Sequence, residues 1–460
     1  MITKIKSAIP YYFFAIIGSI LIFFSIVIMG YLLDRSNYGF YIFYYIVSSA
    51  LVYIYDPGVN AFILNHKVKN RKLKVILYKY ILRHSGVYIC ILYAFAFLAW
   101  LFRGDANFEN LDDVGLFLSF ALIPLIVYLR WVLNAQKIMF IVSNRANEYS
   151  FYYAIGTFSR FVPSLLVAYL FSIEAVLFYH LIIIAFEVSF IDTKYSEGPS
   201  FYGLLLESIK KFGKIRKKFK RHFVIGKYTA VSMSYFFVSQ LDKLAIYMTS
   251  PDYTVITYFN GFLLLSIFLY FSSLANDLFK RGLSFGGHEV STYKSADVAL
   301  YKIIVFYMLV VPSLLLLSIY ISMYFSFFLE IREFLLPSLQ SIIFITVGSI
   351  YFMLIGHLIT YFNRFGFSSY LVFGFCSIIF FYSIGLADFA FSRNFEGISF
   401  LYLFANFLTY YYFFVNFFIR QYTYPARSFI FAGVISLFPL LIGIVLLYYN
   451  PLGINGVFIF

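Results

Sequence analysis

YLLDRSNYGFYIFYYIVSSALVYIYDPGVN, residues 31–60, combines a short polar turn with an apolar run that is long enough to cross a bilayer. The run ends at Asp56, Pro57 and Gly58, which interrupt helical hydrogen bonding. A carboxylate and a proline inside an apolar helix are costly, so they require a compensating role. Two interpretations stay open: Asp56 lines a polar cavity at a broken helix, or it caps the helix fragment that follows Pro57.

The composition indicates a polytopic membrane protein. Hydrophobic residues make up 62% of the 460 residues, and charged residues make up only 12%. A soluble core of this size cannot bury so much apolar surface. The 35 Lys and Arg against 21 Asp and Glu give a net charge of +14. In a chain with so few extramembrane residues, this excess indicates the positive-inside rule rather than a nucleic-acid partner.

Apolar runs of about 20 residues predict thirteen membrane-spanning helices, and hence an all-α fold. The expected spans are 8–33, 38–64, 85–102, 115–134, 148–172, 175–193, 223–249, 254–275, 301–328, 335–362, 366–387, 396–419 and 428–449.

The loop charges indicate the orientation. Residues 65–84 carry seven Lys and Arg, whereas residues 103–114 carry four acids and a single Arg. Residues 210–221 add eight basic residues on the same side as the first basic loop. Because basic loops stay in the cytoplasm, the N-terminus is expected to be cytoplasmic. The simplest role for these loop charges is topology and contact with lipid headgroups.

The longest charged linker separates two halves of the chain. The expected parts are an N-terminal six-helix bundle at 1–195, a basic cytoplasmic linker at 196–222, a C-terminal six-helix bundle at 223–419, and an additional span with the C-terminus at 420–460. A shift of about 215 residues brings Tyr38 onto Tyr253 in corresponding outer turns. Six spans in each repeat would make the two halves parallel repeats.

Charged residues inside the expected spans are few, and they are the candidate functional residues. Each costs roughly 2.5–3.5 kcal/mol at a helix centre, so each should face a polar cavity or another charge. Arg160 lies in the middle of a span, and three polar residues share its helical face: Tyr153, Thr157 and Ser164. This stripe indicates either a polar lumen around Arg160 or a packing clamp between helices.

The other intramembrane charges lie nearer to the expected helix ends. Arg130 and Glu187 are close to cytoplasmic ends, from which long side chains can reach the headgroups. Lys227 begins the seventh expected span, where it can serve topology alone. Asp242 and Lys243 are adjacent in the sequence, and adjacent helical residues point about 100° apart. We therefore expect these two side chains in separate environments rather than paired.

No nucleotide-binding or metalloprotease motif occurs in the sequence. The patterns GxxxxGK[ST] and HExxH are absent, as is a Gly-rich dinucleotide loop. His180 and His357 have no partners at metal-ligand spacing, so both are expected to pack between helices. Transport without ATP hydrolysis by this chain is therefore favoured over catalysis, and no cofactor is expected.

Three short patterns follow one another along the chain. LLxxxxYGxY spans Leu32 to Tyr41, D-x-G spans Asp56 to Gly58, and LDK spans Leu241 to Lys243. In this order, with a basic start and a basic cytoplasmic loop, they resemble polysaccharide flippases of the Wzx type. Those proteins belong to the multidrug, oligosaccharidyl-lipid and polysaccharide exporter superfamily. The resemblance covers most of the first 275 or so residues and only the span pattern beyond them.

The resemblance implies a multi-pass protein of the bacterial inner membrane, built from two six-helix bundles around a central cavity. Its implied activity is to flip an undecaprenyl-diphosphate-linked oligosaccharide by alternating access, for O-antigen of lipopolysaccharide or for capsule. Thirteen spans depart from the twelve or fourteen that are typical of such proteins. The implied partners are the lipid-linked oligosaccharide and membrane lipids, with a polysaccharide polymerase and a chain-length regulator as further candidates.

The implied substrate gives roles to the intramembrane charges. A diphosphate in a low-dielectric region needs cations, and the guanidinium fork suits phosphate oxygens. The cations expected to bind the diphosphate are Arg160, Lys227 and Arg130. The residues expected to act in coupling or gating, with H⁺ or Na⁺ as the coupling ion, are Asp56, Asp242 and Lys243.

Two other functions stay open. A multidrug or cation exporter of the same superfamily should present an anionic cavity, whereas the candidate residues here are mainly cationic. A membrane polymerase or glycosyltransferase should carry a sizeable extramembrane loop with its acids or arginines. No expected outer loop exceeds about a dozen residues, which disfavours that second alternative.

Overall fold

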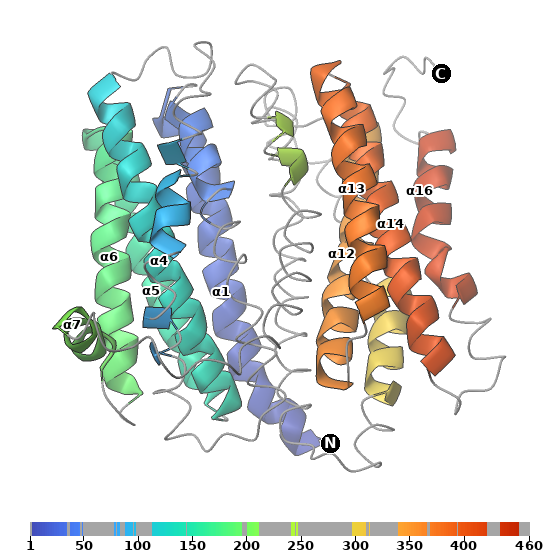
Figure 1. Ribbon diagram of the computed structural model, residues 1–460, viewed down its shortest axis with the longest axis horizontal. Helices are drawn as coiled ribbons and strands as arrows, with labels where there is room; N and C mark the ends of the chain where they lie inside the picture. Colours follow the sequence, from blue (N-terminus) through green and yellow to red (C-terminus); the bar gives the residue numbers. More distant parts are fainter. Residues whose placement is uncertain are drawn as a thin grey trace. The chain divides into compact units, whose positions relative to one another are not determined.

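A computed structural model shows the protein as an assembly of long helices (Figure 1). It describes residues 2–34, 37–46, 48, 78–79, 81–82, 88–94, 96–97, 113–143, 145–195, 200–210, 241–243, 245–246, 297–309, 312, 339–365, 369–392, 394–420 and 433–449. The named helices are α1 (Ile2–Leu32), α4 (Asp113–Val142), α5 (Ala146–Leu170), α6 (Ile173–Lys194), α7 (Phe201–Lys210), α12 (Leu339–Phe365), α13 (Ser369–Phe391), α14 (Phe395–Arg420) and α16 (Phe438–Tyr449). Across these ranges the chain forms no strand.

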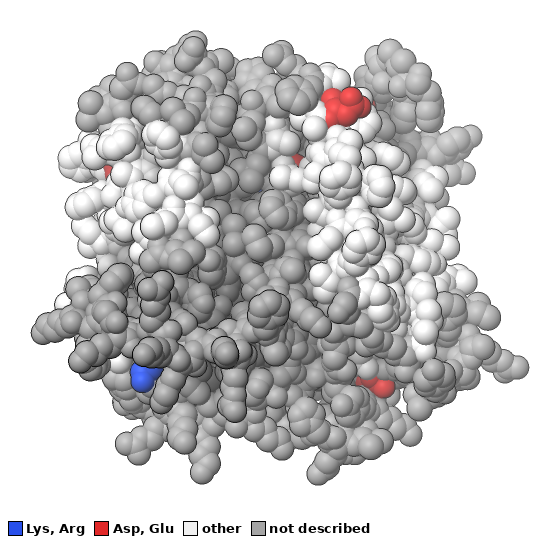
Figure 2. Space-filling model, viewed as in Figure 1, with Lys and Arg blue, Asp and Glu red and all other residues white. Residues whose placement is uncertain are grey.

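Within the described residues, six helices are long and apolar enough to cross a membrane. Their apolar segments, with mean hydropathies of 1.2 to 2.0, are Phe117–Ile141, Asn147–Leu170, Ile173–Lys194, Ile343–Phe362, Tyr370–Ala390 and Glu396–Ile419. The described side chains on the face in Figure 2 are almost all uncharged, as a surface in contact with lipid requires. The prediction of an all-α polytopic membrane protein is confirmed.

The expected first span and the turn after it are both present, as α1 and the residues that follow it. Asp34 organises the turn, because its backbone carbonyl accepts a hydrogen bond from the Tyr38 N–H at 2.9 Å. The carboxylate of Asp34 also accepts a hydrogen bond from the Asn37 amide. The Tyr38 ring packs onto α1 at Gly30, where a Cβ would lie 3.1 Å from the ring. Glycine at this position therefore lets the second helix start close against the first.

The first compact unit of the chain comprises Met1–Phe236 and Asp277–Phe285. Within this unit α1 packs against α5, α5 packs against α6, and α4 contacts both α5 and α6. The short helix α7 lies crosswise at the C-terminal end of α6 (Figure 1). Asp192 holds this corner, because its carboxylate accepts hydrogen bonds from the Phe201 N–H at 2.7 Å and from the Tyr78 hydroxyl at 2.8 Å.

Helix α4 continues to Val142, past the expected end of its span at residue 134. The apolar run stops there because polar residues follow, among them Gln136. Gln136 is nevertheless fully buried, and its amide donates hydrogen bonds to the Tyr78 hydroxyl at 3.0 Å and to the Val188 carbonyl at 3.1 Å. Since these partners satisfy the NH2 group of the amide inside the protein, the helix can pass through a polar position without leaving the packed interior.

The second compact unit comprises Phe237–Asn276 and Gly286–Phe460. Within it α12 packs against α14 and α16, and α13 packs against α14. The two units share this packing pattern: α4 and α5 each pack against α6, and α12 and α13 each pack against α14. Helix α13 begins at Ser369 and α5 begins at Ala146, 223 residues earlier. This spacing is close to the shift of about 215 residues that aligns the outer turns.

Candidate functional site

Arg160 is a buried cation in the middle of α5, with only 5% of its surface exposed. Its Nε donates a hydrogen bond to the Gly156 carbonyl, one turn earlier, at 3.2 Å. The same Nε lies 3.2 Å from Oε2 of Glu187 in α6. In the part of the chain that the structure describes, Arg160 has polar partners at Nε only. Among the described residues, no hydrogen bond or ion pair engages its two Nη groups, which carry most of its N–H donors.

Glu187 lies inside the first unit, and its side chain is 5% exposed. The interpretation in which Glu187 reaches the headgroups is therefore wrong. The carboxylate turns toward Arg160 because a buried charge without a counter-charge would be strongly destabilising. Gly156 makes the approach possible, since a Cβ at that position would lie 2.2 Å from Oε1 and 2.4 Å from Cδ of Glu187.

Arg130 of α4 supplies a second cation to the same region, and its Nη1 donates a hydrogen bond to the Ser48 hydroxyl. Nearby, the Tyr44 hydroxyl lies 3.1 Å from Nδ1 of His180. Both arginines lie within electrostatic range of the same three side chains, namely Tyr44, His180 and Glu187. We call this group the Arg160 cluster, which consists of Tyr44, Arg130, Arg160, His180 and Glu187.

His180 packs between helices, as the sequence predicted. Its ring centroid lies 5.6 Å from that of Phe161 and 5.8 Å from that of Tyr44. In the second unit His357 is likewise fully buried, and its ring lies 5.4 Å from the Tyr307 ring. The contact between His180 and Tyr44 was not foreseen, because it joins residues from distant parts of the sequence.

The polar stripe beside Arg160 takes part in helix packing. Thr157 and Ser164 are fully buried, and the Ser164 hydroxyl donates a hydrogen bond to the Phe161 carbonyl at 2.7 Å. A Cβ on Gly18 of α1 would lie 3.0 Å from the Tyr153 ring and 3.7 Å from Oγ1 of Thr157. This part of the stripe therefore faces α1, and Gly18 allows α1 to approach it closely.

Asp242 and Lys243 form a buried ion pair in the second unit. The lysine Nζ lies 3.3 Å from Oδ1 of Asp242, and the two side chains are 6% and 0% exposed, respectively. The expectation of separate environments is wrong for this pair. The flexible four-carbon stem of lysine lets the ammonium turn back to its neighbour, and burial of both charges favours their contact. Lys243 Nζ also lies 5.6 Å from the ring centroid of Tyr402 in α14.

Two of the candidates, Asp56 and Lys227, lie outside the described residues, and their roles stay predictions. Gly156 and Tyr44 were not among the predicted functional residues. Gly156 carried a signal, because it precedes Arg160 by one helical turn and so shares its face. Tyr44 is one of 44 tyrosines and carried none.

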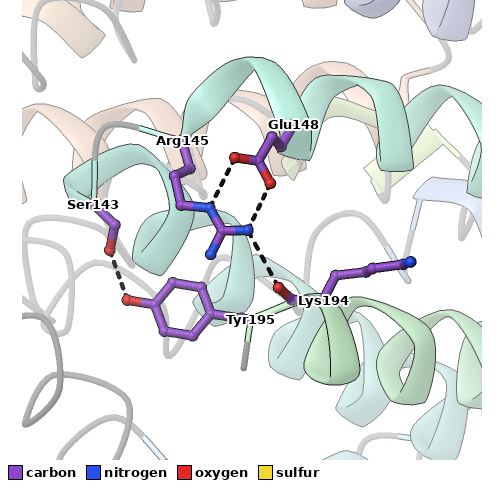
Figure 3. Close-up of polar contacts among 5 residues, drawn as sticks. All are labelled: Ser143, Arg145, Glu148, Lys194 and Tyr195. Carbon is purple, nitrogen blue, oxygen red and sulfur yellow. Dashed lines mark hydrogen bonds and ion pairs between the residues drawn. The ribbon is translucent and has the colours of Figure 1, made fainter. Parts of the chain in front are cut away.

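A second polar cluster ties the turn between α4 and α5 to the end of α6 (Figure 3). Nε and Nη2 of Arg145 donate hydrogen bonds to the two carboxylate oxygens of Glu148 at 2.9 and 2.6 Å. Nη2 also donates to the Lys194 carbonyl at 3.2 Å. The hydrogen bonds to Glu148 raise the pKa of the Arg145 guanidinium above its ordinary value. The Tyr195 hydroxyl lies 2.6 Å from Oγ of Ser143 and completes a structural tie.

Among the described residues, no three His, Cys, Asp or Glu side chains are grouped to hold a metal ion. The Arg160 cluster instead contains two guanidinium groups and one carboxylate, a set of groups that forms ion pairs.

Several solved structures share the fold of this chain. An outward-facing multidrug resistance MATE family transporter of the MOP superfamily superposes with a TM-score of 0.58 at 12% identity, over 90% of this chain and 95% of its own. A MOP superfamily transporter from Pyrococcus furiosus gives a TM-score of 0.54 at 13% identity, over 90% of this chain and 95% of its own.

The lipid II flippase MurJ, in an inward closed conformation, gives a TM-score of 0.51 at 15% identity, over 97% of this chain and 99% of its own. No protein-family model matches the sequence, and no curated protein matches it. The chain therefore has the fold of MOP superfamily membrane transporters, as the sequence analysis expected.

Proposed function

We propose that this protein is a flippase that moves an oligosaccharide linked to undecaprenyl diphosphate across a bacterial inner membrane by alternating access. The cargo would be a repeat unit of O-antigen or capsule. The fold supports this proposal, because a lipid II flippase shares it and the architecture can therefore serve a lipid substrate. The observation that carries the proposal is the buried Arg160, whose Nη groups have no polar partner among the described residues.

A guanidinium inside a membrane protein is costly unless it binds something. A side chain kept only for packing would be expected to engage its whole donor fork, whereas Arg160 engages Nε alone in the described structure. The two Nη groups match the geometry of phosphate oxygens, which accept paired N–H donors. Arg160 is therefore suited to hold the diphosphate of a lipid-linked sugar at membrane depth.

The charge balance of the Arg160 cluster favours an anionic substrate. Arg130 and Arg160 contribute two positive charges, and Glu187 contributes one carboxylate. In the second unit, the buried charges of Asp242 and Lys243 compensate each other. A transporter of cationic drugs should present the opposite excess at its substrate site, so the Arg160 cluster favours a diphosphate over an organic cation.

The remainder of the proposal follows from the sequence. Lys227 would join the two arginines at the diphosphate, and the N-terminus would lie in the cytoplasm. Movement would be coupled to H⁺ or Na⁺ rather than to ATP hydrolysis. The residues proposed for coupling or gating are Asp56, Asp242 and Lys243. Membrane lipids, a polysaccharide polymerase and a chain-length regulator would be partners.

The test is a flipping assay with the full-length protein in liposomes and a fluorescent prenyl-diphosphate oligosaccharide as the substrate. Arg160→Ala should lower the flipping rate by roughly tenfold to a hundredfold, the value of lost charged hydrogen bonds. Arg160→Lys should retain part of the flipping rate, because lysine keeps the positive charge but lacks the paired N–H donors of the guanidinium. Lys194→Ala is the control, since it removes an exposed cation at the end of α6.

A wild-type rate in a well-folded Arg160→Ala protein would remove Arg160 from the substrate site. Wild-type protein that fails to flip the diphosphate but exports lipophilic cations would overturn the proposed substrate class.

A further inference from the structure

We propose that Glu187 is the resident counter-anion of Arg160, which compensates the guanidinium in the empty site and yields it to the phosphate oxygens of an entering substrate. This inference rests on the proposed function and adds a positioning and affinity-setting residue to it. Glu187 would compete with the substrate, so it would limit how tightly the diphosphate is held. Limited affinity matters in a transporter, because a substrate that binds too tightly is released slowly.

The contact between the two residues is an ion pair without a hydrogen bond. The Nε hydrogen of Arg160 is directed to the Gly156 carbonyl, at 3.2 Å. Oε2 of Glu187 lies 3.2 Å from Nε, yet it accepts no hydrogen bond from the described part of the chain. A buried ion pair repays its desolvation only with good geometry and further hydrogen bonds. This pair lacks them, so it is suited to exchange rather than to permanent bracing.

Glu187 approaches Arg160 from the side of Nε. Its carboxylate occupies the space that a side chain at position 156 would fill, since a Cβ there would lie 2.2 Å from Oε1. Because Gly156 has no side chain, the Glu187 carboxylate can lie directly against the backbone of α5. Among the described residues, no hydrogen bond or ion pair engages the Nη groups of Arg160. In the proposed exchange, phosphate oxygens bind these Nη groups first and then draw the guanidinium away from the carboxylate.

The exchange does not leave the carboxylate without a counter-charge. Arg130 also lies within electrostatic range of Glu187. Two cations and one carboxylate leave one positive charge in the empty cluster. When a diphosphate takes Arg160, Arg130 still lies within electrostatic range of Glu187. Arg130 therefore partly offsets the destabilisation of a buried carboxylate in both states.

The experiment measures binding of inorganic pyrophosphate to the full-length protein in lipid nanodiscs by calorimetry. Glu187→Gln should tighten binding by at least roughly tenfold, because it removes the competing charge and keeps the shape. Glu187→Asp keeps the charge and should stay near the wild-type Kd. Gly156→Ala should also tighten binding, because the added methyl displaces the carboxylate from Nε. In an Arg160→Gln background, Glu187→Gln should have no effect.

Thermal unfolding of each variant checks that it is folded. If the Glu187→Gln protein does not fold, the affinity of Gly156→Ala tests the inference instead. The inference fails, and the proposed function survives, if Arg160→Gln loses binding while neither Glu187→Gln nor Gly156→Ala binds more tightly than wild type. Wild-type pyrophosphate binding by Arg160→Gln would overturn both, because Arg160 would then not be the anion site.

Discussion

The hydroxyl of Tyr179 in α6 donates a hydrogen bond of 2.6 Å to the backbone carbonyl of Ser159 in α5. This carbonyl lacks its usual helical donor, because Pro163 stands four residues later and has no N–H. Helix α6 therefore supplies the hydrogen bond that α5 lacks at Ser159, the residue before Arg160. This hydrogen bond explains how α5 tolerates a proline near its buried cation.

Replacing Tyr179 by Phe should lower the free energy of unfolding by about 1–3 kcal/mol, because the Ser159 carbonyl is left without a donor. Thermal unfolding of the purified protein measures the change. Tyr169→Phe is the matched control, since Tyr169 lies in α5 and is 71% exposed. In a Pro163→Ala background the backbone N–H returns, so Tyr179→Phe should cost less. Equal costs in both backgrounds would contradict this account.

The bounds of two apolar helices, α5 and α14, could be predicted from the sequence to within about two residues. The expected spans 148–172 and 396–419 correspond closely to α5 (Ala146–Leu170) and α14 (Phe395–Arg420). Each is an apolar run between polar residues, and a bilayer-length run leaves little freedom for its ends. The end of α4 was not predicted, because the NH2 group of Gln136 donates to tertiary partners that the count of apolar residues does not include.

The partners inside the Arg160 cluster could not be predicted in the same way. A helical face placed Arg160 next to Gly156, because residues four apart share a face. The approach of Glu187 depends on the packing of α6 against α5, and the sequence does not fix which faces meet. The Asp242–Lys243 pair was missed for a different reason, since side-chain flexibility overcame the angle between neighbouring residues.

Gly348 of α12 should be intolerant of even a methyl group. A Cβ there would lie 2.8 Å from the ring of Tyr402 and 3.0 Å from Cα of Leu403, and the second of these atoms belongs to the backbone of α14. Gly348→Ala should therefore lower the apparent Tm, with an overpacking cost of about 1–3 kcal/mol. Gly433→Ala is the control, because nothing lies within 4 Å of that position. A Gly348→Ala protein as stable as Gly433→Ala would refute the close approach of α12 and α14.

Asp192 should control the docking of α7 onto the end of α6. Its carboxylate holds the Phe201 N–H and the Tyr78 hydroxyl, and hydrogen bonds to a charged group contribute about 1.5–3 kcal/mol each. Asp192→Ala should therefore speed amide hydrogen exchange in α7 by roughly tenfold or more. Glu174→Ala, at the opposite end of α6, should leave α7 unchanged. Exchange in α7 that stays at the wild-type rate in Asp192→Ala would show that other contacts hold this helix.

Asp242 and Lys243 should depend on each other for stability. Asp242→Asn removes the carboxylate charge that lies 3.3 Å from the buried Lys243 ammonium, so it should lower the free energy of unfolding by about 3–5 kcal/mol. The double variant Asp242→Asn/Lys243→Gln removes both charges, and it should be more stable than Asp242→Asn alone. Denaturation of wild type, of the single variants Asp242→Asn and Lys243→Gln, and of the double variant completes a double-mutant cycle. If the loss of unfolding free energy in the double variant equals the sum of the losses in the two single variants, the two charges do not interact. The pair could then not act as a single unit in gating.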